Sequence, residues 1–330
     1  MDLLSRIFAR AACVCAFVSS AAAQPLAFDR TVVGPSSSGD CKAIGDIDGD
    51  GKPDAILGGS SLVFYAFSRG FSPCTIAPVP LNGEFSTDAQ ATDIDGDGDI
   101  DVVIGDGNTT NNLVWYENPR INPPTPGATD TCNPANWRRR VIGTQGEWVP
   151  DIEVADLDGD RLPEVVSSGH GITRVWKRPG SGTWSTRTLS TNAGSGVFLG
   201  DIDRDGRRDI ATHLGWLKNP GDVIASPWAF FTVSGASGDE VLLADLNADG
   251  RLDMVTLDAH NRNPVVGLLA PADPRTPGWT SFVIDPFMAS HHPEPADFNA
   301  DGRTDLLFGI ELEESAVYVN LGGSPPVFTK

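Results

Sequence analysis

One nine-residue stretch, Asp93-Ile-Asp-Gly-Asp-Gly-Asp-Ile-Asp101, places side-chain oxygens where they could surround a metal ion. Carboxylates stand at its positions 1, 3, 5 and 9, and glycine stands at position 6, where a tight turn needs a positive φ angle. The carbonyl of the residue at position 7 then points toward the same centre. Because the stretch offers oxygen ligands and neither thiolate nor imidazole, calcium suits it better than zinc or copper.

The pattern occurs six times, at spacings of 47, 63, 45, 44 and 52 residues. We number the copies loops 1 to 6 and expect up to six Ca²⁺ ions. The candidate ligands at positions 1, 3, 5 and 9 are, loop by loop, Asp46, Asp48, Asp50 and Asp54; Asp93, Asp95, Asp97 and Asp101; Asp156, Asp158, Asp160 and Glu164; Asp201, Asp203, Asp205 and Asp209; Asp245, Asn247, Asp249 and Asp253; Asp297, Asn299, Asp301 and Asp305. In loop 3, Arg161 replaces the glycine at position 6, which is expected to weaken that site.

An EF-hand loop opens with the same acids and glycine, but it also needs a glutamate at position 12 and a helix on either side. Position 12 here holds Leu57, Ile104, Ser167, Thr212, Thr256 and Phe308. The apolar runs that follow the loops, such as 102–104, are short and soon reach a glycine, which is typical of strands. The sequence therefore excludes EF-hands and predicts that each loop joins two strands.

A second repeated feature predicts the remaining strands. An aromatic residue stands 17 to 22 positions before each loop and is followed, four and five residues later, by apolar or β-branched residues. These aromatics are Phe28, Phe71, Trp137, Trp184, Trp228 and Trp279, and we expect them to anchor the packing of neighbouring units. With one more apolar run after each loop, every unit has four strands in a period of about 45 residues. The pattern predicts an all-β fold, a β-propeller of about six four-stranded blades.

The two ends of the chain offer competing ways to complete the last blade. The segment Phe28–Val33 has the pattern of a fourth strand, and it could pair with the last third strand, near 317–320. The segment 325–330 also has the pattern of a fourth strand. If both segments form strands, an incomplete seventh blade is expected.

The chain is strongly acidic, with a formal net charge of -20. Four acids stand at the ligand positions in each of the first four loops and three in each of the last two, which is half of the 44 acidic residues. Such a balance argues against nucleic-acid binding, which needs a basic surface. Without bound cations the clustered carboxylates repel one another, so the metal-free protein is expected to be loosened at every loop.

Residues 1–23 resemble a secretory signal peptide, with Arg6 and Arg10, an apolar run over 11–18 and three alanines before Gln24. Residues 24–330 are then a single propeller domain. No later run approaches the roughly 18 apolar residues that span a membrane. We therefore expect an exported protein, secreted or periplasmic. Of its three remaining cysteines, Cys74 and Cys132 are the preferred disulfide pair and Cys41 the free thiol, with unpaired core cysteines as the alternative.

The loops and their spacing resemble the calcium-loop repeats of the FG-GAP/VCBS class, which includes the propeller of integrin α-subunits and many bacterial secreted proteins. The likeness covers roughly residues 28–320 and is most specific in loops 4 and 6, whose sequences are DIDRDGRRD and DFNADGRTD. It implies a calcium-stabilised propeller used for adhesion or for binding an extracellular protein or glycan. Fold alone does not choose among such functions.

The alternative function is a secreted carbohydrate-active enzyme, a polysaccharide lyase or hydrolase. The residues five positions before the loops are Cys41, Asp88, Asp151, Gly196, Glu240 and His292, and they are expected near one mouth of the central channel. Glu147, His213, Glu240 and His292 are the candidates for acid, base or metal ligand there. The sequence has no Ser/His/Asp order, zinc spacing or Gly-rich phosphate loop, so we favour a binding module with polar residues crowding exposed turns.

Overall fold

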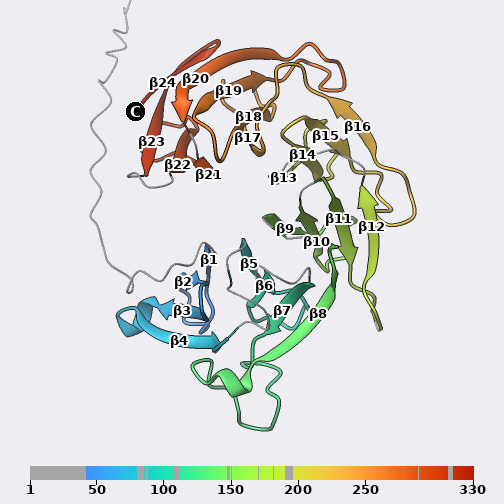
Figure 1. Cartoon of the computed structure of the whole chain (residues 1–330), viewed down its shortest axis with the longest axis vertical. Coiled ribbons are helices and arrows are strands. Elements are labelled where there is room, and N and C mark those ends of the chain that lie inside the picture. The colour runs from blue at the N-terminus through green and yellow to red at the C-terminus, as the bar shows by residue number, and fades with distance from the viewer. Residues whose placement is uncertain are drawn as a thin grey trace, which may run out of the picture.

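The computed structural model describes residues 42–79, 85, 88–106, 112–146, 149, 151–169, 171–180, 182–189, 196–288, 290–310 and 315–330. Its regular elements are strands, apart from two single-turn 3₁₀ segments, η1 (Phe67–Arg69) and η2 (Pro134–Asn136). The strands form six antiparallel four-stranded sheets, the blades of a β-propeller (Figure 1). No helix flanks a loop in this part of the chain, so the exclusion of EF-hands is confirmed.

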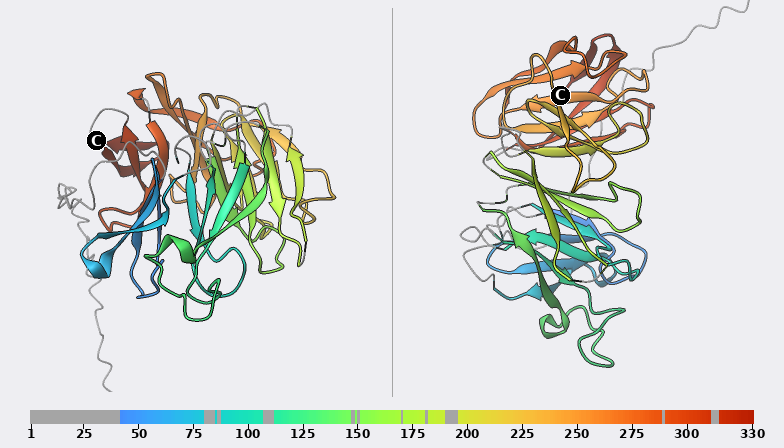
Figure 2. Two further views of the ribbon diagram at one scale, coloured as in Figure 1. Left: turned by 60° about the horizontal axis from the view of Figure 1, so that its bottom comes forward. Right: turned by 90° about the vertical axis from the view of Figure 1, so that its right-hand side faces the viewer.

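Each blade is built from four strands in chain order, and the first strand of each blade lies toward the common centre (Figures 1 and 2). Blades 1 and 2 contain β1 (Lys42–Gly45), β2 (Asp54–Leu57), β3 (Leu62–Ala66), β4 (Ser72–Ala77), β5 (Ala89–Thr92), β6 (Asp101–Gly105), β7 (Asn112–Glu117) and β8 (Arg138–Thr144). Blades 3 and 4 contain β9 (Asp151–Ala155), β10 (Glu164–Ser168), β11 (Thr173–Lys177), β12 (Ser185–Leu189), β13 (Val197–Gly200), β14 (Asp209–Thr212), β15 (Gly215–Lys218) and β16 (Ala229–Thr232). Blades 5 and 6 contain β17 (Glu240–Ala244), β18 (Asp253–Leu257), β19 (Asn263–Leu269), β20 (Thr280–Met288), β21 (Ser290–Ala296), β22 (Asp305–Ile310), β23 (Ala316–Gly323) and β24 (Pro326–Thr329).

The core lies between blades, because each of the inner blades 2 to 5 buries both faces of its sheet against its neighbours. In β6, Val102, Val103 and Ile104 are all fully buried. Val102 and Ile104 pack against blade 1, and Val103 packs against blade 3. Successive side chains of a strand point to opposite faces, so a continuous apolar run is the pattern that a sheet covered on both sides requires.

Four of the six repeated aromatics, Trp137, Trp184, Trp228 and Trp279, pack between blades as predicted. Phe71 contacts Phe67 of its own blade, and Phe28 lies outside the described residues. Trp137 lies in the hydrophobic cluster of blades 1 and 2, Trp184 in that of blades 2 and 3, and Trp279 in that of blades 4 and 5. The buried indole N–H groups find backbone acceptors, since Trp137 donates to the Thr131 carbonyl and Trp279 donates to the Pro274 carbonyl. The tryptophans therefore anchor both the packing and the approach to each outer strand.

Buried asparagines join three pairs of blades. Asn118 follows the third strand of blade 2, and its Nδ2 donates to the Ile100 carbonyl of its own blade and, at 2.9 Å, to the Ile47 carbonyl in loop 1. Asn219 and Asn320 make the same bonds from blades 4 and 6 to the preceding loops. All three side chains are fully buried, so each loop backbone is also part of a blade interface.

The C-terminal segment completes the last blade. β24 pairs with β23, which confirms the assignment of 325–330 as a fourth strand. The competing segment, Phe28–Val33, lies outside the described residues, as do residues 1–23, where the sequence predicts a signal peptide. In Figure 1 the strands β1 and β21 stand at the two ends of the arc of blades. On β1, Ile44 is 74% exposed, whereas Leu243 at the matching place in β17 is 3% exposed against blade 4.

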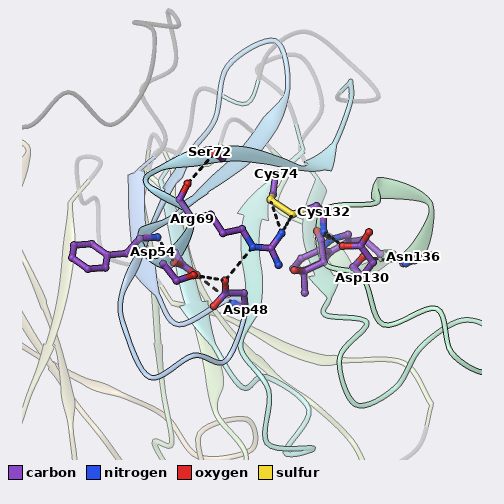
Figure 3. The surroundings of a disulfide bond; sticks show 12 residues. Asp48, Asp54, Arg69, Ser72, Cys74, Asp130, Cys132 and Asn136 are labelled. Atoms are coloured by element: carbon purple, nitrogen blue, oxygen red, sulfur yellow. Dashed lines mark hydrogen bonds and ion pairs between the residues drawn. A yellow bond between two sulfur atoms is a disulfide. The ribbon is translucent and has the colours of Figure 1, made fainter.

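A disulfide links the outer strand of blade 1 to the long connection between β7 and β8, residues 118–137, which we call the excursion. Cys74 of β4 is bonded to Cys132, and Figure 3 shows the Arg69 guanidinium beside both sulfurs. Arg69 also approaches the Asp48 carboxylate of loop 1, with 3.8 Å between Nε and Oδ2. The preferred pairing of Cys74 with Cys132 is confirmed, and it fixes the excursion against blade 1.

Replacing Asn118 with alanine is expected to lower the free energy of unfolding by about 2–4 kcal/mol, because two carbonyl oxygens at a buried interface lose their donor. Urea denaturation followed by tryptophan fluorescence measures the change. Asn261, which is exposed and bonds only within its own turn region, provides the control. Its alanine variant should stay within about 0.5 kcal/mol of the wild type. Equal losses in the two variants would contradict a bridging role for Asn118.

Candidate metal centres

The carboxylate at position 1 of each loop holds the turn in shape. Asp46 accepts hydrogen bonds from the backbone N–H groups of Asp50 and Gly51, each at 2.9 Å. The position 1 acids of the other five loops accept bonds from the same turn of their own loops. The loop is thus folded around this carboxylate by local bonds. In loops 1 to 4 the position 3 acid lies close to it, and the position 5 acid does so in loop 1.

The acid at position 9 is a buried anchor as well as a candidate ligand. Asp54 is 1% exposed; its Oδ2 accepts from the Ile47 N–H at 3.0 Å and its Oδ1 from the Phe67 N–H at 3.0 Å. The corresponding aspartates of loops 2, 4, 5 and 6 make the same two bonds. The sequence pattern indicated ligation alone and missed this second role, which ties the loop to the end of the third strand.

In four loops the acids converge closely enough to hold one ion. Three carboxylates of each loop have oxygens within 4.8 Å of one another: Asp46, Asp48 and Asp50; Asp93, Asp95 and Asp101; Asp156, Asp158 and Glu164; Asp201, Asp203 and Asp209. Loops 5 and 6 have asparagine at position 3, and the Asn247 and Asn299 side-chain oxygens accept a bond from the backbone N–H at position 5.

Buried oxygens without a partner supply an independent test of fit. Among the described residues, one oxygen of Asp48, of Asp99 and of Asp203 is buried and has no hydrogen-bond partner. Asp48 and Asp203 stand at position 3, and Asp99 stands at position 7 of loop 2. Leaving a buried carboxylate oxygen unpaired is costly, and a hard cation bound by the same loop would satisfy it. The residues present therefore fit a divalent metal.

The electrostatics of the loops agree with that fit. Burial raises the pKa of Asp101 to about 9, against the lowering effect of its backbone bonds, and the nearby charges of Asp95 and Asp99 raise it further. Burial likewise raises the pKa of Glu164 and of Asp209 to about 7. In these three loops burial thus disfavours the charged form of the position 9 acid, and a bound cation would favour it.

Two positions in each loop have left-handed backbone, whereas the sequence pattern indicated only one. Position 6 has positive φ in all six loops, including loop 3, where Arg161 has a φ of 76°. Position 4 does so as well, and there Arg204, Ala248 and Ala300 occupy a conformation that favours glycine. Position 4 is glycine in loops 1 to 3 but arginine or alanine in loops 4 to 6, so the sequence pattern did not indicate its left-handed conformation.

Two of the acids predicted at the channel mouth bond to a neighbouring blade. Asp88 and Asp151 bond to the next blade, with Asp88 Oδ2 accepting from the Ile152 N–H at 3.3 Å and Asp151 Oδ2 from the Val197 N–H at 2.7 Å. These two acids therefore join blades. The bonds run between the same positions of successive blades, which a sequence pattern alone does not show.

Glu240 and His213 do lie near each other, at the seam of blades 4 and 5. His213 is 7% exposed and its pKa is lowered by burial, against the raising influence of Asp239 and Glu240. His260 Nε2 is 3.9 Å from Asp239 Oδ2. The other two candidates cannot be placed in this group, because Glu147 and the side chain of His292 lie outside the described residues.

A model of one protein family matches most of the repeats. Its description is "FG-GAP-like repeat", and it matches residues 46–104, 93–167, 156–212 and 245–308, which together are more than half of the chain. The matches begin at loops 1, 2, 3 and 5. A comparison with curated protein sequences found no match. In the part of the chain that the structure describes, no helix is long and apolar enough to cross a membrane.

Solved structures of similar fold are distant in sequence. A lectin of Agrocybe aegerita, described as recognising non-reducing terminal N-acetylglucosamine, has 18% identity and a TM-score of 0.56, over 88% of this chain and 78% of its own. The biofilm matrix protein Bap1 of V. cholerae has 13% identity and a TM-score of 0.46, over 92% of this chain and 62% of its own. The Tc holotoxin pore of Photorhabdus luminescens has 15% identity and a TM-score of 0.40, over 87% and 14%.

Replacing Arg161 with glycine is expected to raise the free energy of unfolding by about 0.5–1 kcal/mol, because glycine relieves the left-handed strain at position 6 of loop 3. Urea denaturation in the presence of a chelator measures it without a contribution from metal. Gly206 is the matched control at position 6 of loop 4, where an added Cβ would meet no atom within 4 Å. Gly206→Ala should destabilise by about 1 kcal/mol. An Arg161→Gly variant less stable than the wild type would contradict the strain at this position.

Proposed function

Because this chain belongs to the FG-GAP-like repeat family, we propose that it is an exported calcium-binding β-propeller that acts as a binding or adhesion module. The observation that carries the proposal is the convergence of three carboxylates in each of loops 1 to 4, with buried unpaired oxygens on Asp48 and Asp203. Oxygen-only ligand sets of this kind favour calcium over softer metals.

The side chains at positions 1, 3, 5 and 9 would hold the ion, together with the carbonyl at position 7. Bound calcium supplies a fixed positive charge that neutralises these carboxylates and holds the first and second strands of the blade together. Loop 2 carries a further acid, Asp99, at position 7; burial raises its pKa to about 7, and a cation nearby would favour its charged form. In loops 5 and 6, Asn247 and Asn299 keep an oxygen ligand but lose a charge, so we expect weaker sites there.

Export is supported by the disulfide between Cys74 and Cys132, because disulfides persist in oxidising compartments. The signal-like residues 1–23 point to the same place. We propose a secreted or periplasmic protein whose partners are extracellular glycans or proteins and not nucleic acids. The acidic balance of the chain, -20 in formal charge, agrees with this choice.

The likeness in fold suggests which class of ligand to test first. A lectin that recognises terminal N-acetylglucosamine has this fold at 18% identity, so glycans are the first class of ligand to test. The alternative of a polysaccharide lyase or hydrolase has less support, because Asp88 and Asp151, two acids of the row expected at the channel mouth, are engaged between blades.

Removing calcium is expected to lower the melting temperature by at least about 10 °C. A site at 100 times its Kd contributes about 2.7 kcal/mol, and each kcal/mol shifts the melting temperature of a large domain by about 2–4 °C, so two occupied sites account for about 11–22 °C. Differential scanning calorimetry with chelator, and after calcium is restored, measures the change. Asp95→Asn should lower the melting temperature in calcium and have little effect in chelator. An unchanged melting curve after thorough chelation, with no stoichiometric metal by elemental analysis, would count against the proposal.

The purified mature protein is expected to bind at least one extracellular glycan or matrix protein saturably, and to lose that binding in chelator. An array of glycans and matrix proteins, probed with and without calcium, measures this directly. Failure to bind any probe would argue against the binding module. Turnover of a polysaccharide that is lost in both His213→Ala and Glu240→Ala variants would favour the enzyme.

A further inference from the structure

Two lysines reach into the loops that would hold a cation. Lys177 is the last residue of β11, and its Nζ donates to Asp158, to Asp160 at 2.6 Å and to Glu164 at 3.2 Å, all in loop 3. Lys218 is the last residue of β15, and its Nζ donates to Asp203 and, at 2.6 Å, to Asp205, both in loop 4. Each ammonium thus bridges the carboxylates at positions 3 and 5 of its loop.

The two lysines occupy equivalent places in adjacent blades, and the other four blades differ there. Lys218 directly precedes Asn219, whose N–H donates to the position 9 acid Asp209. The equivalent residues of blades 1, 2, 5 and 6 are Ala66, Glu117, Leu269 and Val319. An ammonium at this place is therefore specific to loops 3 and 4.

Other basic side chains near the loops do not bridge positions 3 and 5 in the same way. Arg251 and Arg303, at position 7 of loops 5 and 6, pair with the position 5 acids Asp249 and Asp301. In loop 1, Arg69 remains 3.8 Å from Asp48. In loop 2, position 7 is itself an acid, Asp99.

A metal ion bound to the acids at positions 3 and 5 would lie close to where the lysine Nζ lies. An ammonium has three N–H donors and one positive charge, so it can bond these oxygens but cannot share them at close range with a divalent cation. In loop 4, Asp203 retains a buried oxygen without a partner, so Lys218 neutralises the loop only in part. Lysine and metal therefore compete for loops 3 and 4.

We propose that Lys177 and Lys218 are tethered counter-ions that compete with calcium, so that loops 1 to 4 fall into two functional classes. This inference rests on the proposed calcium binding. Loops 1 and 2 depend on the ion for their order. Loops 3 and 4 bind it more weakly and keep their shape without it, so the adjacent blades 3 and 4 stay ordered when calcium is scarce.

The first test is calcium titration of the full mature protein by isothermal calorimetry. In the Lys177→Met/Lys218→Met double variant, two sites should bind calcium at least about tenfold more tightly than in the wild type, because two unit charges leave the neighbourhood of the ions. Both side chains are about a quarter exposed, at 26% and 27%, so methionine can be accommodated. Lys52→Met is the matched control, because Lys52 is in loop 1 and its ammonium lies over the Phe67 ring. An isotherm unchanged in the double variant would overturn the proposal.

The second test needs no metal and so remains informative even if no loop binds calcium. Hydrogen exchange in chelator should show the amides of 156–164 and 201–209 exchanging at least about tenfold more slowly than those of 93–101. The double variant should lose this protection in loops 3 and 4, and Lys52→Met should retain it. Equal exchange of loops 2, 3 and 4 in the wild type would overturn the role of the lysines. Absence of calcium binding in both proteins would instead overturn the proposed function.

Discussion

The buried carboxylate that ends each loop is the interaction on which every blade depends. Asp209, for example, is fully buried and accepts backbone N–H bonds from Ile202 at 3.0 Å and from Asn219 at 2.8 Å. One side chain thereby joins the start of the loop, the second strand and the end of the third strand. Burying a carboxylate is costly, so the arrangement requires the N–H donors on one side and positive charge nearby on the other.

That requirement links the loops to the assembly of the blades. The amide of Asn219 bonds both the Arg208 carbonyl of its own loop and the Leu157 carbonyl in the loop of the preceding blade. A change in the shape of a loop would therefore alter the hydrogen bonds at the interface of two blades. At the other end of the first strands, away from the loops, Asp88 joins blade 2 to blade 3 and Asp151 joins blade 3 to blade 4. The polar bonds thus supplement hydrophobic clusters that already span neighbouring blades.

The fold could be predicted from the sequence because its determinants are local. The spacing of the ligands predicts a turn, and the apolar runs on either side predict the two strands that it joins. The six-fold recurrence of this unit predicts the blades. The roles of Asn118, Lys177 and Asp151 could not be found in this way. Each depends on which atom of another strand or blade lies opposite, and residue type alone does not reveal it. Similarly, the two segments able to form a fourth strand had equal local patterns, and pairing with β23 distinguished β24.

The bond between Cys74 and Cys132 has a mechanical consequence when tension is applied to the chain. Its sulfurs join β4 to the excursion of blade 2, across a sequence separation of 58 residues. Tension applied at the C-terminus can unfold blades 6 to 3, but it cannot extend residues 75–131 while the bond between Cys74 and Cys132 is intact. Reduction releases about 200 Å of additional chain length, at roughly 3.4 Å per residue. The redox state of the surroundings therefore sets how far this chain can be extended.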